Sequence, residues 1–368
     1  MISSKYFLKF LLKKKINFFT GVPDSLLKFF LNELNLISKN NNITAVNEGS
    51  AVSMAIGYYL ATKKIPCVYM QNSGLGNAIN PLASLAHKKV YSVPMVLIVG
   101  WRGGPSYHDE PQHKVKGKIT LKLLKLLKVK YEILNNKVKN FNKFSKLIRY
   151  SEKNSTPVAI IVEKNTFEQN KKIRIDKTKN KSVYRREIIE ILLKKIKKKT
   201  KLISTTGYTS RELNQLRSQR KLYNGQDFYL VGGMGHATSV ALGVALKTKN
   251  KVVCLDGDGS LLMHMGSLST VGYFKNKNFL HIMFNNKSHE SVGGQKVLSD
   301  QVDFKNMILS LGYKNYSLVS NKKEFNKRID AFLNSKGPSF INILTRKGTL
   351  KDLKRPSNLK KIKRFFIS

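Results

Sequence analysis

Two apolar runs of the chain each end in polar residues, Val252-Val-Cys-Leu-Asp-Gly-Asp-Gly-Ser260 and Phe279-Leu-His-Ile-Met-Phe-Asn-Asn286. Short apolar runs of this kind are typical of buried strands. Asp258 and Asn286 should therefore lie just past the carboxyl ends of two strands, where open α/β sheets bind ligands. Their side-chain oxygens, with a nearby backbone carbonyl, suit Mg²⁺ held against a phosphate. Gly259 and Ser260 begin a predicted helix, whose free N–H groups favour an anion.

The chain repeats itself with a constant offset of 186 residues. Segment 51–63 matches segment 237–249, so that Gly57 pairs with Gly243, and the register continues into an apolar strand and a turn in each half. The two halves are therefore predicted to be copies of one series of strands and helices, of which the second alone kept the metal-ligand pattern. Chance similarity of two glycine-bearing helices is the alternative.

The length of 368 residues suits two domains of ordinary size. Apolar strands alternate with amphipathic helices, which predicts an α/β class with mostly parallel sheets. We expect a first domain over residues 1–165, a polar and charged linker over 166–182, and a second domain over 183–368. The first domain should begin with a helix near Lys5–Lys14, followed by a strand at Ile16–Phe19.

The chain is strongly basic, with 67 lysine and arginine residues against 22 acidic ones and a formal net charge of +45. Such a balance can indicate nucleic-acid binding. Lysine is scattered along the whole chain, however, and none of the motifs of nucleic-acid-binding modules is recognisable. We therefore expect no nucleic-acid partner, although the positive field would attract anionic substrates.

Cysteine content and hydropathy indicate the cellular location that we expect for the protein. Cys67 and Cys254 are too few for a disulfide framework and should pack as small apolar side chains. No apolar run approaches the 18 residues of a membrane-spanning helix, and no cleavage site follows the apolar stretch near the N-terminus. We expect a soluble cytoplasmic protein without a membrane partner.

The turn Gly257-Asp258-Gly259, followed by Asn285-Asn286, resembles the motif of thiamine diphosphate-dependent enzymes. A glycine turn with an unrelated asparagine pair is the alternative. Glu48, just before the helix of the first repeat, stands where these enzymes aim a glutamate at the pyrimidine ring of the cofactor. The resemblance implies thiamine diphosphate and Mg²⁺ as cofactors, bound by two doubly wound parallel-sheet domains, one pyrimidine-binding and one diphosphate-binding.

Beyond the cofactor site, the chain resembles the phosphonopyruvate decarboxylase family from Gly21 to about Gly294, a family with no middle domain. The matching stretches are Gly21–Leu27, Tyr69–Asn77, Gly100–Gly103, Asp109–His113, Thr206–Arg211 and Ser288–Gln295. The chain departs from this family at Lys287, where glycine is usual, at Lys296-Val297, where Pro-Thr is usual, and at His108, where lysine is more frequent.

The resemblance implies roles for individual residues. Asp258 and Asn286 would bind Mg²⁺ through their side chains, and Ser288 through its carbonyl. The cofactor itself would be contacted by Gly207, Thr209, Gly232, Met234, Gly257, Gly259 and Ser260. Catalytic roles would fall to Glu48, Ser25, Gln71, His113 and His289, and the anionic groups of the substrate would be bound by Arg102, His108 and Lys114. Any one of the basic residues, taken alone, is more often a surface or structural residue.

The implied reaction is the non-oxidative decarboxylation of 3-phosphonopyruvate to phosphonoacetaldehyde and CO₂, a carboxy-lyase step in phosphonate biosynthesis of the 2-aminoethylphosphonate type. Two alternatives are a decarboxylase of a related anionic 2-oxo acid such as sulfopyruvate, and a non-catalytic basic binding protein on the same scaffold. In the resembling family, the pyrimidine-binding domain of one chain faces the diphosphate-binding domain of another. We therefore expect a homodimer or higher homo-oligomer with active sites at the subunit interface.

Overall fold

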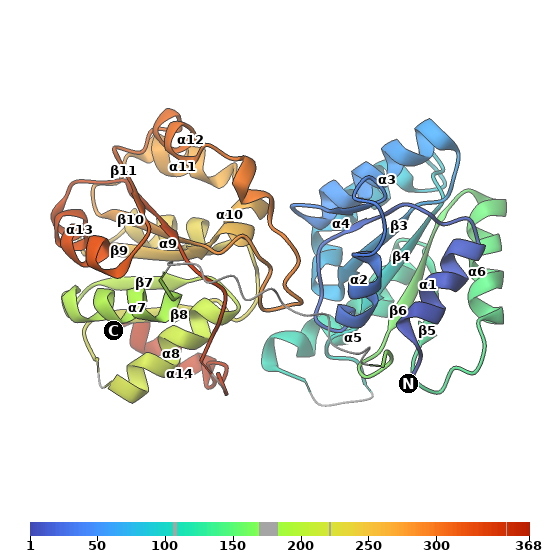
Figure 1. The fold of residues 1–368 in the computed structure, drawn as a ribbon, viewed down its shortest axis with the longest axis horizontal. Coiled ribbons are helices and arrows are strands. Elements are labelled where there is room, and N and C mark those ends of the chain that lie inside the picture. Colours follow the sequence, from blue (N-terminus) through green and yellow to red (C-terminus); the bar gives the residue numbers. More distant parts are fainter. Residues whose placement is uncertain (106–108, 169–182, 221, 351) are drawn as a thin grey trace. The chain divides into compact units, whose positions relative to one another are not determined.

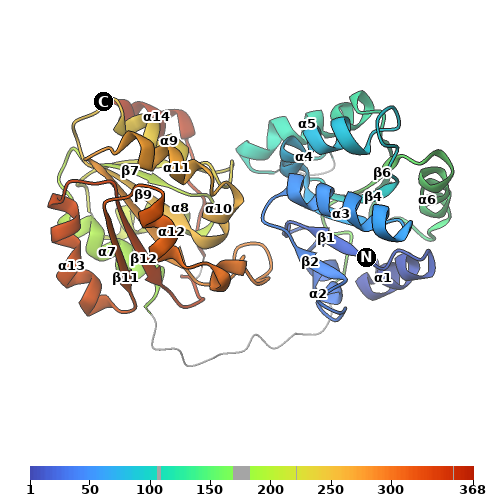
Figure 2. The same cartoon turned by 90° about the horizontal axis from the view of Figure 1, so that it is seen from above.

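The computed structural model describes residues 1–105, 109–168, 183–220, 222–350 and 352–368. The chain forms two compact units, Met1–Asp176 with Val292–Gln295, and Lys177–Ser291 with Lys296–Ser368. Each unit holds a six-stranded parallel sheet with helices on both faces (Figure 1, Figure 2). The predicted class of two doubly wound parallel-sheet domains is thereby confirmed. The boundaries of the linker 166–182 stay a prediction, since most of that segment lies outside the described residues.

The sheet of the first unit has the strand order β2-β1-β3-β4-β6-β5. Its strands are β1 (Phe19–Gly21), β2 (Asn42–Thr44), β3 (Cys67–Gln71), β4 (Met95–Gly100), β5 (Lys130–Leu134) and β6 (Pro157–Val162). Its helices are α1 (Ser4–Lys13), α2 (Lys28–Leu34), α3 (Glu48–Thr62), α4 (Leu75–Pro81), α5 (Pro111–Leu126) and α6 (Asn142–Asn154), with the short turns η1 (Asn72–Gly74) and η2 (Leu82–Ala86).

The sheet of the second unit has the order β11-β12-β10-β9-β7-β8. Its strands are β7 (Lys201–Ser204), β8 (Gln226–Tyr229), β9 (Val252–Gly257), β10 (Phe279–Asn285), β11 (Asn315–Val319) and β12 (Ser339–Leu344). Its helices are α7 (Arg185–Lys195), α8 (Tyr208–Arg220), α9 (Ala237–Ala245), α10 (Asp258–Met263), α11 (Ser267–Phe274), α12 (Phe304–Ser310), α13 (Lys322–Asn334) and α14 (Leu359–Ile367), with the short turn η3 (Leu298–Gln301).

The two sheets have the same topology. When the strands of the second unit are counted from its own first strand and the sheet is followed from the β8 edge, the order is that of the first sheet, with the second strand at one edge and the fifth at the other. Helix α3 precedes β3 in the first unit as α9 precedes β9 in the second. This identity supports the prediction, made from the 186-residue repeat, that the halves are copies of one another.

Strand residues alternate between two apolar layers in each unit, because successive side chains of a strand point to opposite faces. In β4, Val96 and Ile98 pack against α1, α2 and α6, whereas Leu97 and Val99 pack against α3, α4 and α5. In the second unit, α7, α8 and α13 cover one face and α9 to α12, with α14, the other. The inner strands are thus buried on both faces, as is typical of parallel sheets, whereas the edge strands β2, β5, β8 and β11 are only partly buried.

The first strand differs from its predicted position. A strand was expected at Ile16–Phe19, but β1 spans Phe19–Gly21. The backbone N–H of Ile16 bonds back to the carbonyl of Leu11 at 3.1 Å, which continues the end of α1. Ile16 is therefore buried as part of the turn after the helix, and the chain enters the sheet three residues later.

Candidate active site

Glu48 is a buried carboxylate at the first position of α3, with an exposed fraction of 5%. Asn77 of α4 donates a hydrogen bond from Nδ2 to its Oε2 at 2.7 Å. A Cβ at Gly74 would lie 2.2 Å from Oε1, so the carboxylate needs glycine at that position. Burial raises the pKa of the Glu48 carboxyl above its ordinary value, and the hydrogen bond from Asn77 opposes this. The group is thus suited to holding a proton.

An open groove of about 650 Å³ begins beside this glutamate. Its lining is formed by α3, α4 and η2 and is mostly small and polar: Gly49, Ser50, Ser53, Asn77, Asn80, Pro81, Ser84 and Leu85. Asn77 belongs both to this lining and to the hydrogen bond with Glu48. The groove therefore reaches the residue that bonds directly to the buried Glu48 carboxylate.

Arg102, two residues after β4, forms a two-point ion pair with Asp109. Its Nε and Nη2 donate to the two carboxylate oxygens at 2.8 and 2.6 Å, and its Nη1 donates to the Ser25 hydroxyl at 3.1 Å. Burial acts in the opposite direction, but the hydrogen bonds from Arg102 and from backbone N–H groups hold the pKa of Asp109 below its ordinary value. The structure thus joins two predicted site residues, Ser25 and Arg102, and balances the charge of the arginine inside the unit.

Asp24 is a buried carboxylate beside Ser25 that sequence reasoning missed. It is completely buried, and a Cβ at Gly100 would lie 2.0 Å from its Oδ2, so the end of β4 must be glycine here. Burial raises the pKa of Asp24 to about 6, although Arg102 and backbone hydrogen bonds oppose this. A carboxyl that gains and loses a proton near neutrality is a candidate acid–base group. The available signal was its place in the Gly21–Leu27 motif.

The remaining predicted residues of the first unit lie at other places in it. Gln71 ends β3, and its Nε2 donates to the Ser73 hydroxyl at 2.6 Å. His113 is buried in the first turn of α5, and a Cβ at Gly103 would lie 2.1 Å from its carbonyl oxygen. Lys114 is the next residue of α5 and is exposed. His108 lies outside the described residues.

In the second unit, Ser260 connects three segments that were predicted to contact the cofactor. Its hydroxyl lies 2.8 Å from the Thr205 hydroxyl at the end of β7. The same hydroxyl accepts the backbone N–H of Gly235 at 3.1 Å. The turn after β9, the loop after β7 and the loop after β8 therefore meet at one buried side chain. This is the edge of the sheet at which parallel-sheet proteins bind ligands.

The other predicted cofactor residues lie in the same three segments. Gly207 follows β7 with a φ of +92°, a conformation that favours glycine, and Thr209 is buried in the first turn of α8. Gly232 and Met234 are partly exposed in the loop between β8 and α9. Gly257 is the last residue of β9, and Gly259 is buried at the start of α10. Backbone groups and small side chains thus dominate this edge.

Asp258 is 3% exposed at the start of α10. Its Oδ2 accepts the backbone N–H of Lys287 at 2.9 Å and the hydroxyl of Ser299 at 2.9 Å. Burial raises the pKa of the Asp258 carboxyl to about 6, although these hydrogen bonds oppose the shift. A buried carboxylate with a raised pKa is short of positive charge, so it fits a metal cation.

Asn286 directly follows β10, and its Oδ1 accepts the backbone N–H of Ser288 at 3.1 Å. Ser288 is buried and pairs with Lys296 across a short antiparallel bridge. Lys287 between them has a φ of +57°, in the left-handed region that glycine adopts without strain. Lys287 therefore replaces the family's usual glycine at a position whose backbone conformation favours glycine. The donor set of carboxylate, amide and carbonyl oxygens is one that Mg²⁺ accepts.

His289 lies against the turn of Asp258, since a Cβ at Gly259 would approach its Cε1 to 2.8 Å. Burial lowers the pKa of the His289 imidazole to about 4. At neutral pH the His289 imidazole is therefore uncharged. It can donate one hydrogen bond and accept another, but it does not supply positive charge to an anionic substrate.

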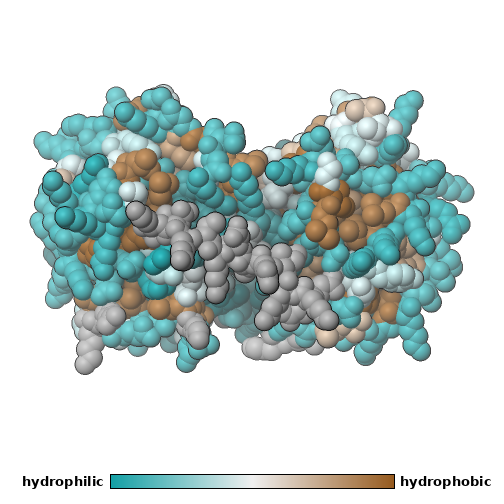
Figure 3. All heavy atoms as spheres, in the orientation of Figure 1, coloured by the Kyte–Doolittle hydropathy of each residue, from teal (hydrophilic) through white to brown (hydrophobic). Residues whose placement is uncertain are grey.

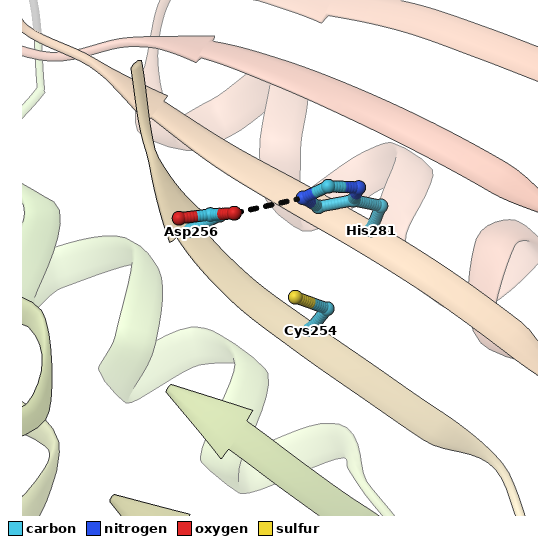
Figure 4. Close-up of side chains that lie close together, drawn as sticks. All are labelled: Cys254, Asp256 and His281. Carbon is cyan, nitrogen blue, oxygen red and sulfur yellow. Dashed lines mark ion pairs between the residues drawn. The ribbon is translucent and has the colours of Figure 1, made fainter. Parts of the chain in front are cut away.

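A second group of potential metal ligands belongs to two neighbouring strands of the second sheet: Cys254 and Asp256 of β9 and His281 of β10 (Figure 4). All three are completely buried, and His281 Nε2 lies 3.6 Å from Asp256 Oδ2. Asp256 already accepts the Gly257 N–H and the Thr238 hydroxyl. Burial raises the pKa of the Cys254 thiol well above its ordinary value, so the thiolate that a metal needs is disfavoured. The cluster is best explained as polar packing between β9 and β10.

The surface of both units is dominated by polar side chains. In the view of Figure 3 both units are mainly hydrophilic, with apolar areas between the polar side chains. Among the described helices, none combines the length and the apolar character that are needed to cross a membrane.

The chain matches two family descriptions and several curated proteins. Residues 1–122 match the thiamine pyrophosphate enzyme, N-terminal TPP binding domain, and residues 205–343 match the corresponding C-terminal TPP binding domain. The chain is 33% identical to a phosphonopyruvate decarboxylase of Streptomyces viridochromogenes, over 91% of this chain and 86% of the relative. It is 26% identical to a sulfopyruvate decarboxylase of Methanosarcina acetivorans, over 86% of this chain and 85% of the relative.

Relatives with separate subunits match shorter parts of the chain. The alpha subunit of the sulfopyruvate decarboxylase of Methanocaldococcus jannaschii is 37% identical over 40% of this chain and 85% of the subunit. The beta subunit is 38% identical over 30% of this chain and 56% of the subunit.

Proposed function

The chain belongs to the thiamine diphosphate-dependent decarboxylases of the phosphonopyruvate and sulfopyruvate type, and we propose that its substrate is 3-phosphonopyruvate, which it converts to phosphonoacetaldehyde and CO₂. It is thus a carboxy-lyase. The observation that carries the substrate proposal is the 33% identity to a phosphonopyruvate decarboxylase over 91% of the chain. Phosphonate biosynthesis and a cytoplasmic location remain predictions that accompany this substrate.

The second unit would hold the diphosphate end of the cofactor through Mg²⁺. We assign the metal to Asp258, Asn286 and the carbonyl of Ser288, because these are hard oxygen donors and the pKa of Asp258 is raised to about 6 by burial. Ser260, Gly259, Gly207 and Thr209 would contact the diphosphate, and Gly232 and Met234 the aminopyrimidine ring. When bound, thiamine diphosphate supplies the electron sink for the electrons that remain when CO₂ leaves.

Glu48 of the first unit would hold and move a proton at N1′ of the aminopyrimidine. Its burial, its raised pKa and its hydrogen bond from Asn77 support this role, because burial favours the protonated form of the carboxyl and Asn77 holds the group in place. Ser25 and Gln71 would face the reacting keto acid, with Asp24 behind Ser25 as a second carboxyl that titrates near neutrality, with a pKa of about 6.

The substrate carries a carboxylate and a phosphonate, so its pocket needs positive charge or many hydrogen-bond donors. Arg102 is the predicted anchor, but Asp109 balances its charge in this structure. Neutral His289 and buried His113 would then donate hydrogen bonds, while Lys114 and the positive field of the chain would supply net charge.

Sulfopyruvate is the second candidate substrate, because a whole-length sulfopyruvate decarboxylase matches 86% of the chain. Phosphonate and sulfonate groups differ by one negative charge near neutrality and have the same tetrahedral shape. The test is turnover of phosphonopyruvate, sulfopyruvate and pyruvate with thiamine diphosphate and Mg²⁺, with phosphonoacetaldehyde identified by phosphorus NMR. Preference for sulfopyruvate would overturn the substrate proposal, and lack of turnover of all three would overturn the activity.

We further propose that the active form is a homodimer or a higher homo-oligomer with its sites at the subunit interface. The existence of sulfopyruvate decarboxylases with separate alpha and beta subunits, both similar to parts of this chain, supports assembly between two kinds of unit. Glu48 and Asp258 lie in different units, so a site can draw one residue from each of two chains.

A further inference from the structure

Arg185, the first residue of α7, lies between two acidic side chains of the second unit. Only 7% of it is exposed, and its Nε donates to Oε2 of Glu212 in α8 at 2.8 Å. Its Nη1 lies 3.8 Å from Oε2 of Glu290, in the loop after β10. Glu212 is completely buried. Since two carboxylates share one guanidinium, these three side chains form an ionic network that is buried at Arg185 and Glu212 and partly exposed at Glu290, and removal of one partner would weaken the charge balance of another.

Glu290 connects this network to Asn286. Its Oε2 accepts a hydrogen bond from Asn286 Nδ2 at 3.1 Å, and its Oε1 accepts the backbone N–H of Gly348. On the other side of the same amide, Asn286 Oδ1 accepts the backbone N–H of Ser288 at 3.1 Å. The amide nitrogen therefore faces a pure acceptor and the amide oxygen faces a pure donor, so both contacts favour the same orientation of the Asn286 side chain.

The orientation matters because the two ends of an amide differ chemically. The oxygen is an acceptor and can bind a cation, whereas the NH₂ group is a donor only. A carboxylate accepts hydrogen bonds and repels the amide oxygen, so Glu290 holds the nitrogen toward itself and leaves the oxygen on the side of the Ser288 N–H.

We propose that Glu290, held by Arg185, is a positioning residue that fixes the Asn286 amide with its oxygen available to the metal. This inference rests on the proposed function, because it assumes that Asn286 is a magnesium ligand. Arg185 extends the effect further: it also holds Glu212 of α8, the helix that begins at the predicted diphosphate-binding residues Gly207 and Thr209. One guanidinium thus joins the metal-ligand loop to the diphosphate-binding helix.

The test is the affinity of the full-length protein for Mn²⁺ in the presence of thiamine diphosphate, measured from the electron paramagnetic resonance signal of free Mn²⁺. Glu290→Gln keeps the size of the side chain but can face the Asn286 amide in either orientation. Residues behind a metal ligand typically contribute about 10- to 100-fold to metal affinity, so a loss in this range is expected. Thiamine diphosphate affinity at saturating Mn²⁺ should stay within about threefold of wild type.

Glu324→Gln is the matched control. Glu324 lies in α13 of the same unit and also pairs with an arginine, Arg328 at 2.9 Å, but at the surface. The Glu324→Gln protein should bind Mn²⁺ with the affinity of wild type. Should Glu290→Gln fail to fold, Arg185→Lys is the second variant: it keeps the charge and loses the guanidinium fork, and a severalfold weaker Mn²⁺ affinity is expected.

The discriminating step repeats Glu290→Gln in an Asn286→Asp background. A carboxylate at 286 has two oxygens and no orientation to fix, so Glu290→Gln should now cost no Mn²⁺ affinity. A merely structural role would weaken Mn²⁺ binding equally in both backgrounds, and that result, or an unchanged affinity in the Asn286 background, overturns the proposal. Wild-type protein that fails to bind Mn²⁺ with thiamine diphosphate would instead contradict the cofactor assignment itself.

Discussion

The two units make the same bridge between neighbouring strand ends with different residues. In the first unit, Asn72 follows β3, and its Oδ1 accepts the backbone N–H of Arg102, two residues after β4, at 3.2 Å. In the second, Asp258 follows β9, and its Oδ2 accepts the backbone N–H of Lys287, two residues after β10, at 2.9 Å. Asn72 stands 186 residues before Asp258, which is the offset of the repeat.

The difference between the bridges is the charge. The Asn72 amide is neutral, and its NH₂ group also donates to the Arg102 carbonyl at 2.8 Å and to the Thr120 hydroxyl at 2.9 Å. Both polar atoms of the Asn72 amide are thus satisfied by hydrogen bonds within the first unit. Asp258 leaves a buried carboxylate, with a pKa raised to about 6, that internal hydrogen bonds do not balance. We therefore propose that the second unit binds a cation at this position and that the first unit does not.

The largest effect is expected when the second unit receives the residue of the first. Asp258→Asn keeps an acceptor for the Lys287 N–H but removes the charged ligand, so Mg²⁺-dependent binding of thiamine diphosphate should weaken by orders of magnitude and turnover should cease. Isothermal titration calorimetry with and without Mg²⁺ measures this. Binding that remains Mg²⁺-dependent at wild-type affinity would remove Asp258 from the metal site.

The next largest effect is expected from the proposed proton-transfer role of Glu48 in the first unit. Glu48→Gln is nearly isosteric and can still bond to Asn77, but it cannot hold or pass a proton. Turnover should fall by about 10²- to 10⁴-fold, with cofactor affinity largely retained. Hydrogen–deuterium exchange at C2 of bound thiamine diphosphate is the direct assay, and a wild-type exchange rate in the variant would exclude Glu48 from proton transfer.

Mixing the two inactive chains tests whether the units of different subunits cooperate. If each site takes Glu48 from one chain and Asp258 from another, co-expressed Glu48→Gln and Asp258→Asn chains form about half mixed dimers with one intact site of two. Recovery should then approach roughly a quarter of wild-type activity. The amount of heterodimer must be verified with two affinity tags. No recovery in purified heterodimers would mean that each site is built within one chain.

The smallest effect is expected at Lys287, whose φ of +57° strains a residue with a side chain. Lys287→Gly should stabilise the protein by at most about 1 kcal/mol, because the relief of strain is partly offset by the larger entropy of the unfolded chain. Lys275→Gly is the matched control, since Lys275 has a φ of +48° at the end of α11. Chemical denaturation measures both, and marked destabilisation by Lys287→Gly alone would show that the lysine is required there.

Much of the fold followed from the sequence, because its evidence is local. Apolar runs such as Val252–Leu255 mark strands buried on both faces, and the 186-residue repeat predicted two like units. Strand β1 was misplaced because Ile16 is as apolar as a strand residue, and only its hydrogen bond to Leu11 assigns it to the helix end.

The site was less predictable, because its partners are brought together by the fold. The pairing of Arg102 with Asp109 joins residues that lie close in the sequence, but nothing in the residue types said that the arginine would be neutralised. The raised pKa of Asp24, to about 6, depends on complete burial against Gly100, far away in the chain. The ion pair of Glu290 with Arg185 likewise joins residues that lie far apart in the chain.

The most direct test of the contrast between the units is the stability of metal-free Asp258→Asn protein. The Asp258 carboxyl has a folded-state pKa of about 6, above its ordinary 3.8. Burial therefore costs little stability below pH 3.8, where the carboxyl is protonated in both states; the cost grows as the pH rises from 3.8 to 6 and levels off at about 3 kcal/mol above that. Urea denaturation at pH 7.5 should find the metal-free variant more stable than wild type by up to this amount, and the order should reverse when Mg²⁺ and thiamine diphosphate stabilise wild type alone. A metal-free variant no more stable than wild type, or one stabilised by Mg²⁺ as wild type is, would contradict the account.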